Sequence, residues 1–145
     1  VIRETTHRFS RLSFHRSMVG RRLPLLMTAI GRAYFAFCPP AEREELIELL
    51  ISRDDEQSAL AADRGFVDRL VEHTLGKGYG ENNSHWGLER KIAAIAIPIR
   101  HEERVMGCLN LVYIAKAMSV EEAARRYLPA MQGVVEKIRT QLAEC

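Results

Sequence analysis

The most informative part of the sequence is residues 91–114, KIAAIAIPIRHEERVMGCLNLVYI. Two apolar runs, at about 91–99 and 104–114, flank the short polar segment His101-Glu102-Glu103. Apolar runs of this length with so short a connection are typical of an antiparallel hairpin. Because both runs are apolar nearly throughout, we expect both faces of the hairpin to be covered by other parts of the protein.

The two faces of the predicted hairpin differ in side-chain size. Alternate side chains of a strand share a face. In the first run one face carries Ala94, Ala96 and Pro98, and the other carries mainly isoleucine. The bulky face suits packed helices. The face of small residues leaves space that a closely packed element or a ligand must fill, since protein interiors do not tolerate large voids cheaply.

Asn110 is the one strongly polar side chain in the second apolar run, where it shares a face with Cys108 and Val112. A buried amide without partners costs about 1–3 kcal/mol. We therefore expect Asn110 to bond either to a neighbouring loop or to a ligand, and the sequence leaves both alternatives open. The small-residue argument places Ala94 and Asn110 on the wall of one cavity.

Most of the remaining elements are predicted to be helices, over about 28–37, 41–52, 63–75 and 120–142. Thr28 is a plausible N-cap, and Gly76 and Gly78 are expected to end the third helix. Pro129 should kink the last helix. Period-two alternation at 11–18 predicts a half-buried strand, and a short strand is expected near Tyr79.

Composition excludes several classes of protein. The chain is 47% hydrophobic and 28% charged, which is typical of one globular domain. It contains no apolar run of membrane-spanning length and no signal peptide. The three cysteines are odd in number and widely spaced, so we expect free thiols and a cytoplasmic location. A start at Val1 rather than methionine suggests a fragment cut at a domain boundary.

Charge is unevenly distributed along the chain. Residues 1–32 contain seven arginines and one acid, whereas residues 41–57 contain seven acids and two arginines. A basic segment is compatible with nearby nucleic acid, but solvated basic and acidic faces are the favoured interpretation. No recognition helix with a basic flank is evident, so we expect no specific binding of duplex DNA by this chain alone.

The sequence contains no recognisable catalytic motif. Its histidines and cysteines lack metal-ligand spacing, and it has no glycine-rich phosphate loop or nucleophile elbow. We therefore predict no enzyme, metal or cofactor. A thiol enzyme using Cys108 is kept as an alternative, which would require a nearby base and a lowered thiol pKa.

A polar loop before the hairpin carries His85, Trp86 and Arg90. One interpretation is a rim that closes over a small aromatic anion, because an arginine fork binds a carboxylate well. The alternatives are a surface salt bridge for Arg90 and a core position for Trp86.

Several segments in order resemble the effector-binding domain of IclR-type transcriptional regulators. They are GRRLPL at 20–25, TAIGRA at 28–33, Gly78-Tyr79, the strand IAAIAIPI at 92–99 and GCLNL at 107–111. The resemblance covers about 8–142 and is greatest to activators of hydroxyphenylpropionate-type aromatic acid catabolism. It implies an α+β, GAF/PAS-like domain over residues 1–145, in which helices flank a curved antiparallel sheet. It also implies an N-terminal winged helix-turn-helix that this chain lacks.

The function implied by the resemblance is ligand sensing by a homodimer or tetramer that contacts DNA only through the missing N-terminal domain. The predicted effector-binding residues are Ala29, Ile30, Asn82, Trp86, Arg90, Ala94, Cys108, Asn110 and Val112. Family members often carry an acid where Asn82 stands, and serines at the positions of Asn110 and Val112. These departures favour a larger aromatic acid over a small keto acid. A ligand-free oligomerisation domain remains the other alternative.

Overall fold

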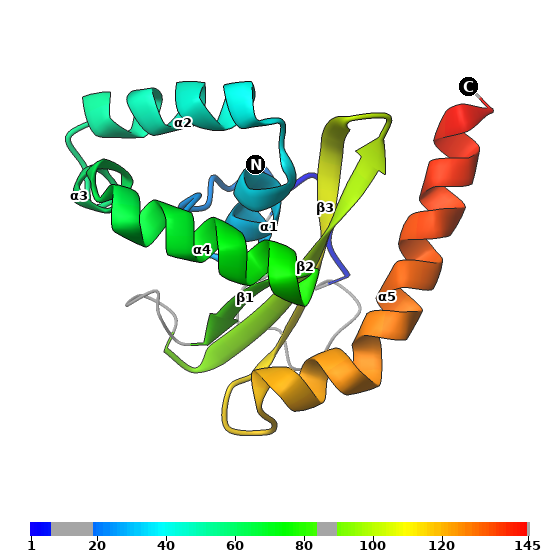
Figure 1. Ribbon diagram of the computed structural model, residues 1–145. Coiled ribbons are helices and arrows are strands. Elements are labelled where there is room, and N and C mark those ends of the chain that lie inside the picture. The colour runs from blue at the N-terminus through cyan, green and yellow to red at the C-terminus, as the bar shows by residue number, and fades with distance from the viewer. Residues whose placement is uncertain (7–18, 84–89, 145) are drawn as a thin grey trace.

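The computed structural model describes residues 1–6, 19–83 and 90–144. An antiparallel sheet lies between α5 on one side and α1 with the other helices on the opposite side (Figure 1). The elements in this part of the chain are α1 (Ala29–Phe37), α2 (Pro40–Ser52), α3 (Ser58–Ala62), α4 (Arg64–Lys77), β1 (Gly80–Asn83), β2 (Ile92–His101), β3 (Arg104–Ile114) and α5 (Val120–Ala143). The strand predicted at 11–18 lies outside the described residues.

The predicted hairpin is confirmed: its first strand, β2, is the central strand of the described sheet, and its second, β3, lies at the edge. Strand order is β1-β2-β3, and both pairings are antiparallel. His101 pairs with Arg104, so Glu102 and Glu103 alone make the turn. Glu102 has a φ of 53°, a left-handed conformation that allows the chain to reverse within two residues.

The bulky face of the sheet packs against a helix, as the sequence predicts, and that helix is α5. Ile95 and Ile97 form one core with Met131 and Val135 of the helix. Ser119 caps this helix by accepting a hydrogen bond from the Glu122 N–H at 3.1 Å. Figure 1 shows α5 bending in its N-terminal half, the part that contains Pro129. The bend fits the loss of a backbone donor at proline.

The small-residue face packs against α1. Ala29 and Ala33 of the helix form a cluster with Ala94 and Ala96 of β2. Gly80 makes this approach possible, because a Cβ there would lie 2.2 Å from the Ala29 carbonyl oxygen. Of the two sequence-based alternatives for the space above β2, a closely packed element is therefore the one observed.

A second core joins α1 to the helices that follow it. Phe35, Ile47 and Val67 are buried there, one from each of α1, α2 and α4. The acids of α2 are largely exposed, which confirms the interpretation of an acidic solvated face. The short helix α3 is not predicted by the sequence, because five residues are too few to show a helical period.

Three local expectations are wrong. Gly76 lies within α4, and Gly78, with a φ of 80°, ends the helix alone. The helical spacing of leucine and valine predicts that Leu49 and Leu75 lie on buried stripes, but these side chains are 54% and 46% exposed. β3 is not covered on both faces by the described residues, because Val112 is 38% exposed.

Among the described residues, no helix has the length and apolar character needed to cross a membrane.

Candidate functional site

Cross-strand pairing brings most of the predicted site residues onto one face. Asn82 pairs with Ala94, which pairs with Val112, so the three strands form one row. The next row is Gly80, Ala96 and Asn110. This face is the one that α1 covers.

Seven of the nine predicted residues thus lie together. They are Ala29, Ile30, Asn82, Ala94, Cys108, Asn110 and Val112, and together they are called the α1 face below. Arg90 lies in the turn before β2 and is exposed. Trp86 and His85 lie outside the described residues.

The expected cavity over Ala94 needs correction. Ala94 is only 6% exposed and packs against α1, so the helix fills the space above it. The open part of the α1 face lies along β3, where Val112 is solvent accessible and Cys108 and Asn110 are half-buried. At β1 the fit is tight, because Gly80 leaves no room for a side chain beneath α1.

Asn110 is the most informative side chain of the α1 face. Its Oδ1 is shielded from solvent and has no hydrogen-bond partner among the described residues. Such an acceptor costs about 1–3 kcal/mol when unpaired. The neighbours of Asn110 across the sheet, Ala96 and Gly80, carry no polar side-chain group. A donor that displaced the atoms now covering Oδ1 would therefore meet an unused acceptor.

Cys108 lies on the same face but is a poor nucleophile. Burial raises the pKa of its thiol to about 12, so the thiol is protonated at neutral pH. The alternative of a thiol enzyme requires the opposite shift. Within the described segments, no cluster of three His, Cys, Asp or Glu side chains could hold a metal ion.

The start of α1 borders the α1 face. Thr28 caps the helix, because its Oγ1 accepts a hydrogen bond from the Gly31 N–H at 3.2 Å and donates one to the Pro24 carbonyl at 2.8 Å. One backbone donor of the first turn is therefore already used by the cap. Ala29 and Ile30 contribute the other backbone donors of this first turn, the part of a helix that favours an anion.

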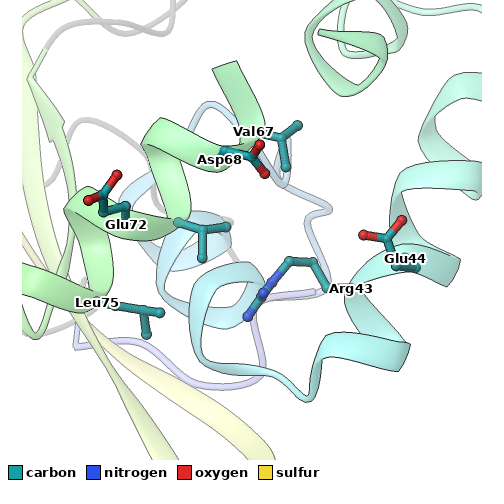
Figure 2. Close-up of a pocket in the computed structure, with 7 residues that line it drawn as sticks. Arg43, Glu44, Val67, Asp68, Glu72 and Leu75 are labelled. Atoms are coloured by element: carbon teal, nitrogen blue, oxygen red, sulfur yellow. The ribbon is translucent and has the colours of Figure 1, made fainter. Parts of the chain in front are cut away.

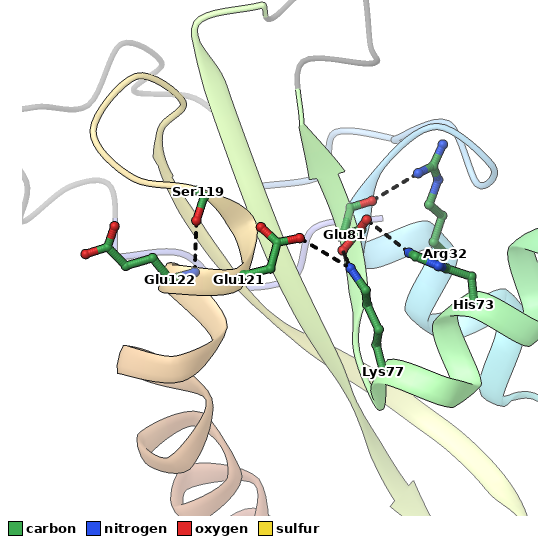
Figure 3. Close-up of polar contacts among 7 residues, drawn as sticks. All are labelled: Arg32, His73, Lys77, Glu81, Ser119, Glu121 and Glu122. Carbon is green, nitrogen blue, oxygen red and sulfur yellow. Dashed lines mark hydrogen bonds and ion pairs between the residues drawn. The ribbon is translucent and has the colours of Figure 1, made fainter.

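A charged network behind the α1 face was missed by sequence reasoning (Figure 3). Arg32 donates to the Leu26 carbonyl through Nε at 2.9 Å and to the Glu81 carbonyl through Nη1 at 3.2 Å. The Glu81 carboxylate contacts Lys77 Nζ at 2.8 Å and His73 Nε2 at 3.1 Å. The signal that could have revealed it is that Arg32 is the one charged residue of the apolar helix α1.

Burial and charge shift the pKa values in this network in opposing ways. Burial lowers the pKa of Arg32, and the nearby Glu81 partly offsets that effect. Burial alone would raise the pKa of Glu81, but hydrogen bonds from Lys77 and His73 bring it below the ordinary value. Both groups are therefore charged at neutral pH; the Glu81 carboxylate forms an ion pair with Lys77, whereas Arg32 is bonded to main-chain carbonyls.

A groove of about 350 Å³ lies between α2 and α4, away from the α1 face (Figure 2). It is lined by Arg43, Glu44, Val67, Asp68, Val71, Glu72 and Leu75. None of the predicted site residues lines it. Arg43 donates to three carbonyls at the end of α1, and Glu44 is paired with Arg64. Two polar side chains of the groove, Arg43 and Glu44, therefore already have hydrogen-bond partners within the protein.

Comparison with known proteins identifies the family. Residues 7–140 match the family described as "Bacterial transcriptional regulator IclR C-terminal". The chain belongs to this family. The resemblance noted in the sequence is thereby confirmed, and members of the IclR family are transcriptional regulators rather than enzymes.

Relatives and solved structures agree with the assignment. The chain is 29% identical over 109 residues to the HTH-type transcriptional regulator XynR of Escherichia coli, covering 74% of this chain and 42% of XynR. It is 28% identical to the solved C-terminal domain of E. coli KdgR, with a TM-score of 0.68 and coverage of 86% and 74%. The chain thus spans less than half the length of XynR.

A third similar structure is an IclR homologue from Microbacterium hydrocarbonoxydans complexed with 4-hydroxybenzoate. It is 24% identical, has a TM-score of 0.65, and the match covers 90% of this chain and 51% of that one. At this identity the similarity supports the fold alone. The α+β architecture predicted from the sequence is confirmed by these IclR C-terminal structures.

Proposed function

We propose that this IclR C-terminal domain senses a small carboxylic acid, of aromatic type, on the α1 face. In the full regulator, binding changes the geometry of a homodimer or tetramer and so controls DNA contact by an N-terminal domain. The observation that carries the proposal is the shielded Asn110 Oδ1, which has no partner among the described residues. A ligand can shift such an equilibrium only by its differential affinity for the two states.

The chemistry of the α1 face favours an aromatic acid that carries a hydroxyl group. The surroundings of Asn110 are small and apolar, because alanine, valine and cysteine occupy the nearby positions. A ring fits such a surface by shape and hydrophobicity. Asn110 Oδ1 would accept a hydrogen bond from the hydroxyl group, and the first-turn N–H groups of α1 would meet the carboxylate.

The homologue complexed with 4-hydroxybenzoate supports this choice of probe. The activity of the whole regulator, its cytoplasmic location and its control of aromatic acid catabolism are part of the proposal.

A thermal-shift screen tests the proposed function. The panel contains 4-hydroxybenzoate, hydroxyphenylpropionate, benzoate and, as small keto acids, pyruvate and glyoxylate. A ligand present at a hundred times its Kd should add about 2.7 kcal/mol to the free energy of unfolding. We expect a hydroxylated aromatic acid to raise Tm most. A panel in which no acid raises Tm at millimolar concentration would contradict the proposal.

The ligand-free oligomerisation domain is the second candidate. The exposed apolar side chains of β3, Met106, Val112 and Ile114, favour a surface for self-association. Sedimentation with and without 4-hydroxybenzoate separates the two functions. A sensor should change its association state or sedimentation coefficient on addition of the acid, whereas a plain oligomerisation domain should not.

A further inference from the structure

We propose that Arg32 is a positioning residue for effector binding. Its guanidinium fixes the turn before α1 to strand β1, and so holds the start of α1 and the strand in a constant position relative to each other. The inference rests on the proposed function, because a residue that positions an effector needs an effector. Nothing in the α1 face itself requires an arginine at this place, since Arg32 lies behind the face and contributes no lining atom to the cluster of Ala29, Ala33, Ala94 and Ala96.

The two hydrogen bonds of Arg32 reach elements that are far apart in the sequence. Nε donates to the Leu26 carbonyl at 2.9 Å, and Nη1 donates to the Glu81 carbonyl at 3.2 Å. Leu26 is fully buried in the helical core, so its carbonyl is a fixed point. Because the guanidinium is planar and rigid, the distance between its two donors sets the distance between the two carbonyls.

Each anchored carbonyl lies next to predicted effector contacts. Leu26 is two residues before the cap Thr28, which sets the start of α1 and therefore the N–H groups of Ala29 and Ile30. Glu81 is one residue before Asn82, whose buried side chain lies in the row of Ala94 and Val112. A shift of either carbonyl would therefore displace a border of the α1 face.

Glu81 also holds β1 through its carboxylate, on the side of the strand away from Arg32. Glu81 contacts Lys77 at 2.8 Å and His73 at 3.1 Å, and both partners come from α4. Figure 3 shows Arg32 approaching Glu81 from the side of α1. Contacts from two helices thus add to the pairing with β2 in holding the four residues of β1.

The chain contains a matched control for Arg32. Arg43 is also partly buried, and it also donates only to main-chain carbonyls in the described structure, those of Phe35, Ala36 and Cys38 at 2.7–3.2 Å. These carbonyls lie at the C-terminal end of α1, whereas Arg32 acts at its N-terminal half. Arg43 should therefore stabilise the fold without positioning the effector.

The experiment compares Arg32→Lys with Arg43→Lys in the chain of residues 1–145. Lysine keeps the charge but lacks the rigid fork of arginine. Arg32→Lys therefore no longer joins its two carbonyls, and Arg43→Lys no longer joins its three. Tm is measured without ligand, and the Kd for 4-hydroxybenzoate and hydroxyphenylpropionate is measured at a temperature well below both Tm values. We expect both variants to lose stability. We expect Arg32→Lys alone to bind more weakly, by roughly tenfold, equivalent to about 1.4 kcal/mol.

The possible outcomes separate the inference from the proposed function. If the unmodified chain binds neither acid, the proposed function fails and the inference fails with it. If the unmodified chain binds but Arg32→Lys binds equally well, or both variants weaken binding to the same degree, Arg32 is merely structural and only the inference is overturned. A selective loss in Arg32→Lys, with Arg43→Lys at the wild-type Kd, supports it.

Discussion

Replacing Asn110 with leucine should change stability and effector binding in opposite directions. Asn110 Oδ1 is shielded from solvent and unpaired in the described structure, a condition that costs about 1–3 kcal/mol. Leucine has a similar size and no polar atom, so the ligand-free protein should gain about 1 kcal/mol of unfolding free energy. The effector would lose its hydrogen bond to the amide, about 1–2 kcal/mol, which corresponds to a roughly 5- to 30-fold weaker Kd.

Tyr113→Phe is the control for this variant. The Tyr113 hydroxyl is the other shielded side-chain polar atom without a partner in the described structure. Tyr113 is on the same strand, but it pairs with Ala93 on the face that α5 covers. Removing its hydroxyl should therefore stabilise the protein and leave the Kd unchanged.

The assay is urea unfolding together with calorimetric titration of 4-hydroxybenzoate, on both variants and on the unmodified chain. An Asn110→Leu variant that binds with the wild-type Kd would refute the assignment of the amide to the effector. Equal weakening by Tyr113→Phe would show that binding responds to the sheet as a whole rather than to the α1 face.

Four further predictions follow from single contacts. Gly80→Ala should cost roughly 1–3 kcal/mol in urea unfolding, because its Cβ would lie 2.2 Å from the Ala29 carbonyl oxygen; an unchanged midpoint would show that α1 does not press on β1. Ser119→Ala should lower stability by about 1 kcal/mol through loss of the α5 cap, measured as a lower Tm, and an unaltered Tm would argue against the cap. Burial opposes the charged form of Glu81, but hydrogen bonds lower its pKa, so the stabilisation it provides is complete above the unfolded pKa of about 4.3 and is lost as pH falls through the lower folded pKa. Glu81→Gln should therefore reduce the loss of unfolding free energy measured between neutral and acid pH. Burial raises the pKa of Cys108 to about 12, so iodoacetamide should modify this thiol in urea but not in the folded protein at neutral pH. Rapid labelling of Cys108 itself in the folded protein, located by peptide mass spectrometry, would revive the thiol-enzyme alternative.

The hairpin and the size difference between its faces could be predicted because both are local properties of the sequence. Period-two alternation places Ala94 and Ile95 on opposite faces whatever the rest of the chain does. What covers each face is a long-range property. The sequence limits what can fill the space above Ala94 to a packed element or a ligand. Only the position of α1 shows which of the two is present.

Gly80 illustrates why that outcome could not be read from the sequence. In the sequence it is one of several glycines between 76 and 87, a pattern that predicts a loop. In the fold it is the first residue of β1, packed so tightly against α1 that a side chain has no room. Its role depends on two segments that the sequence separates by about fifty residues, so no local rule identifies it.

Polar residues also differ in how far the sequence alone indicates their role. Asn110 could be singled out, because one amide in an apolar strand is conspicuous in any fold. Arg32 is also conspicuous, as the one charged residue of α1, but its bonds could not be predicted, because its partners are main-chain carbonyls, which every residue has. The placement of Ala29, Ile30, Asn82 and Val112 near Asn110 comes from the fold, and their role as effector contacts stays a prediction.

The most direct test of an effector on the α1 face is the NMR signal of the Asn110 side-chain amide in ¹⁵N-labelled protein during titration with 4-hydroxybenzoate. The account predicts a saturable shift of this signal, together with the backbone amides of Ile30 and Asn82, while the amides of Asp68 and Glu72 at the α2–α4 groove stay in place. Saturable shifts at the groove with an unmoved Asn110 signal would contradict it.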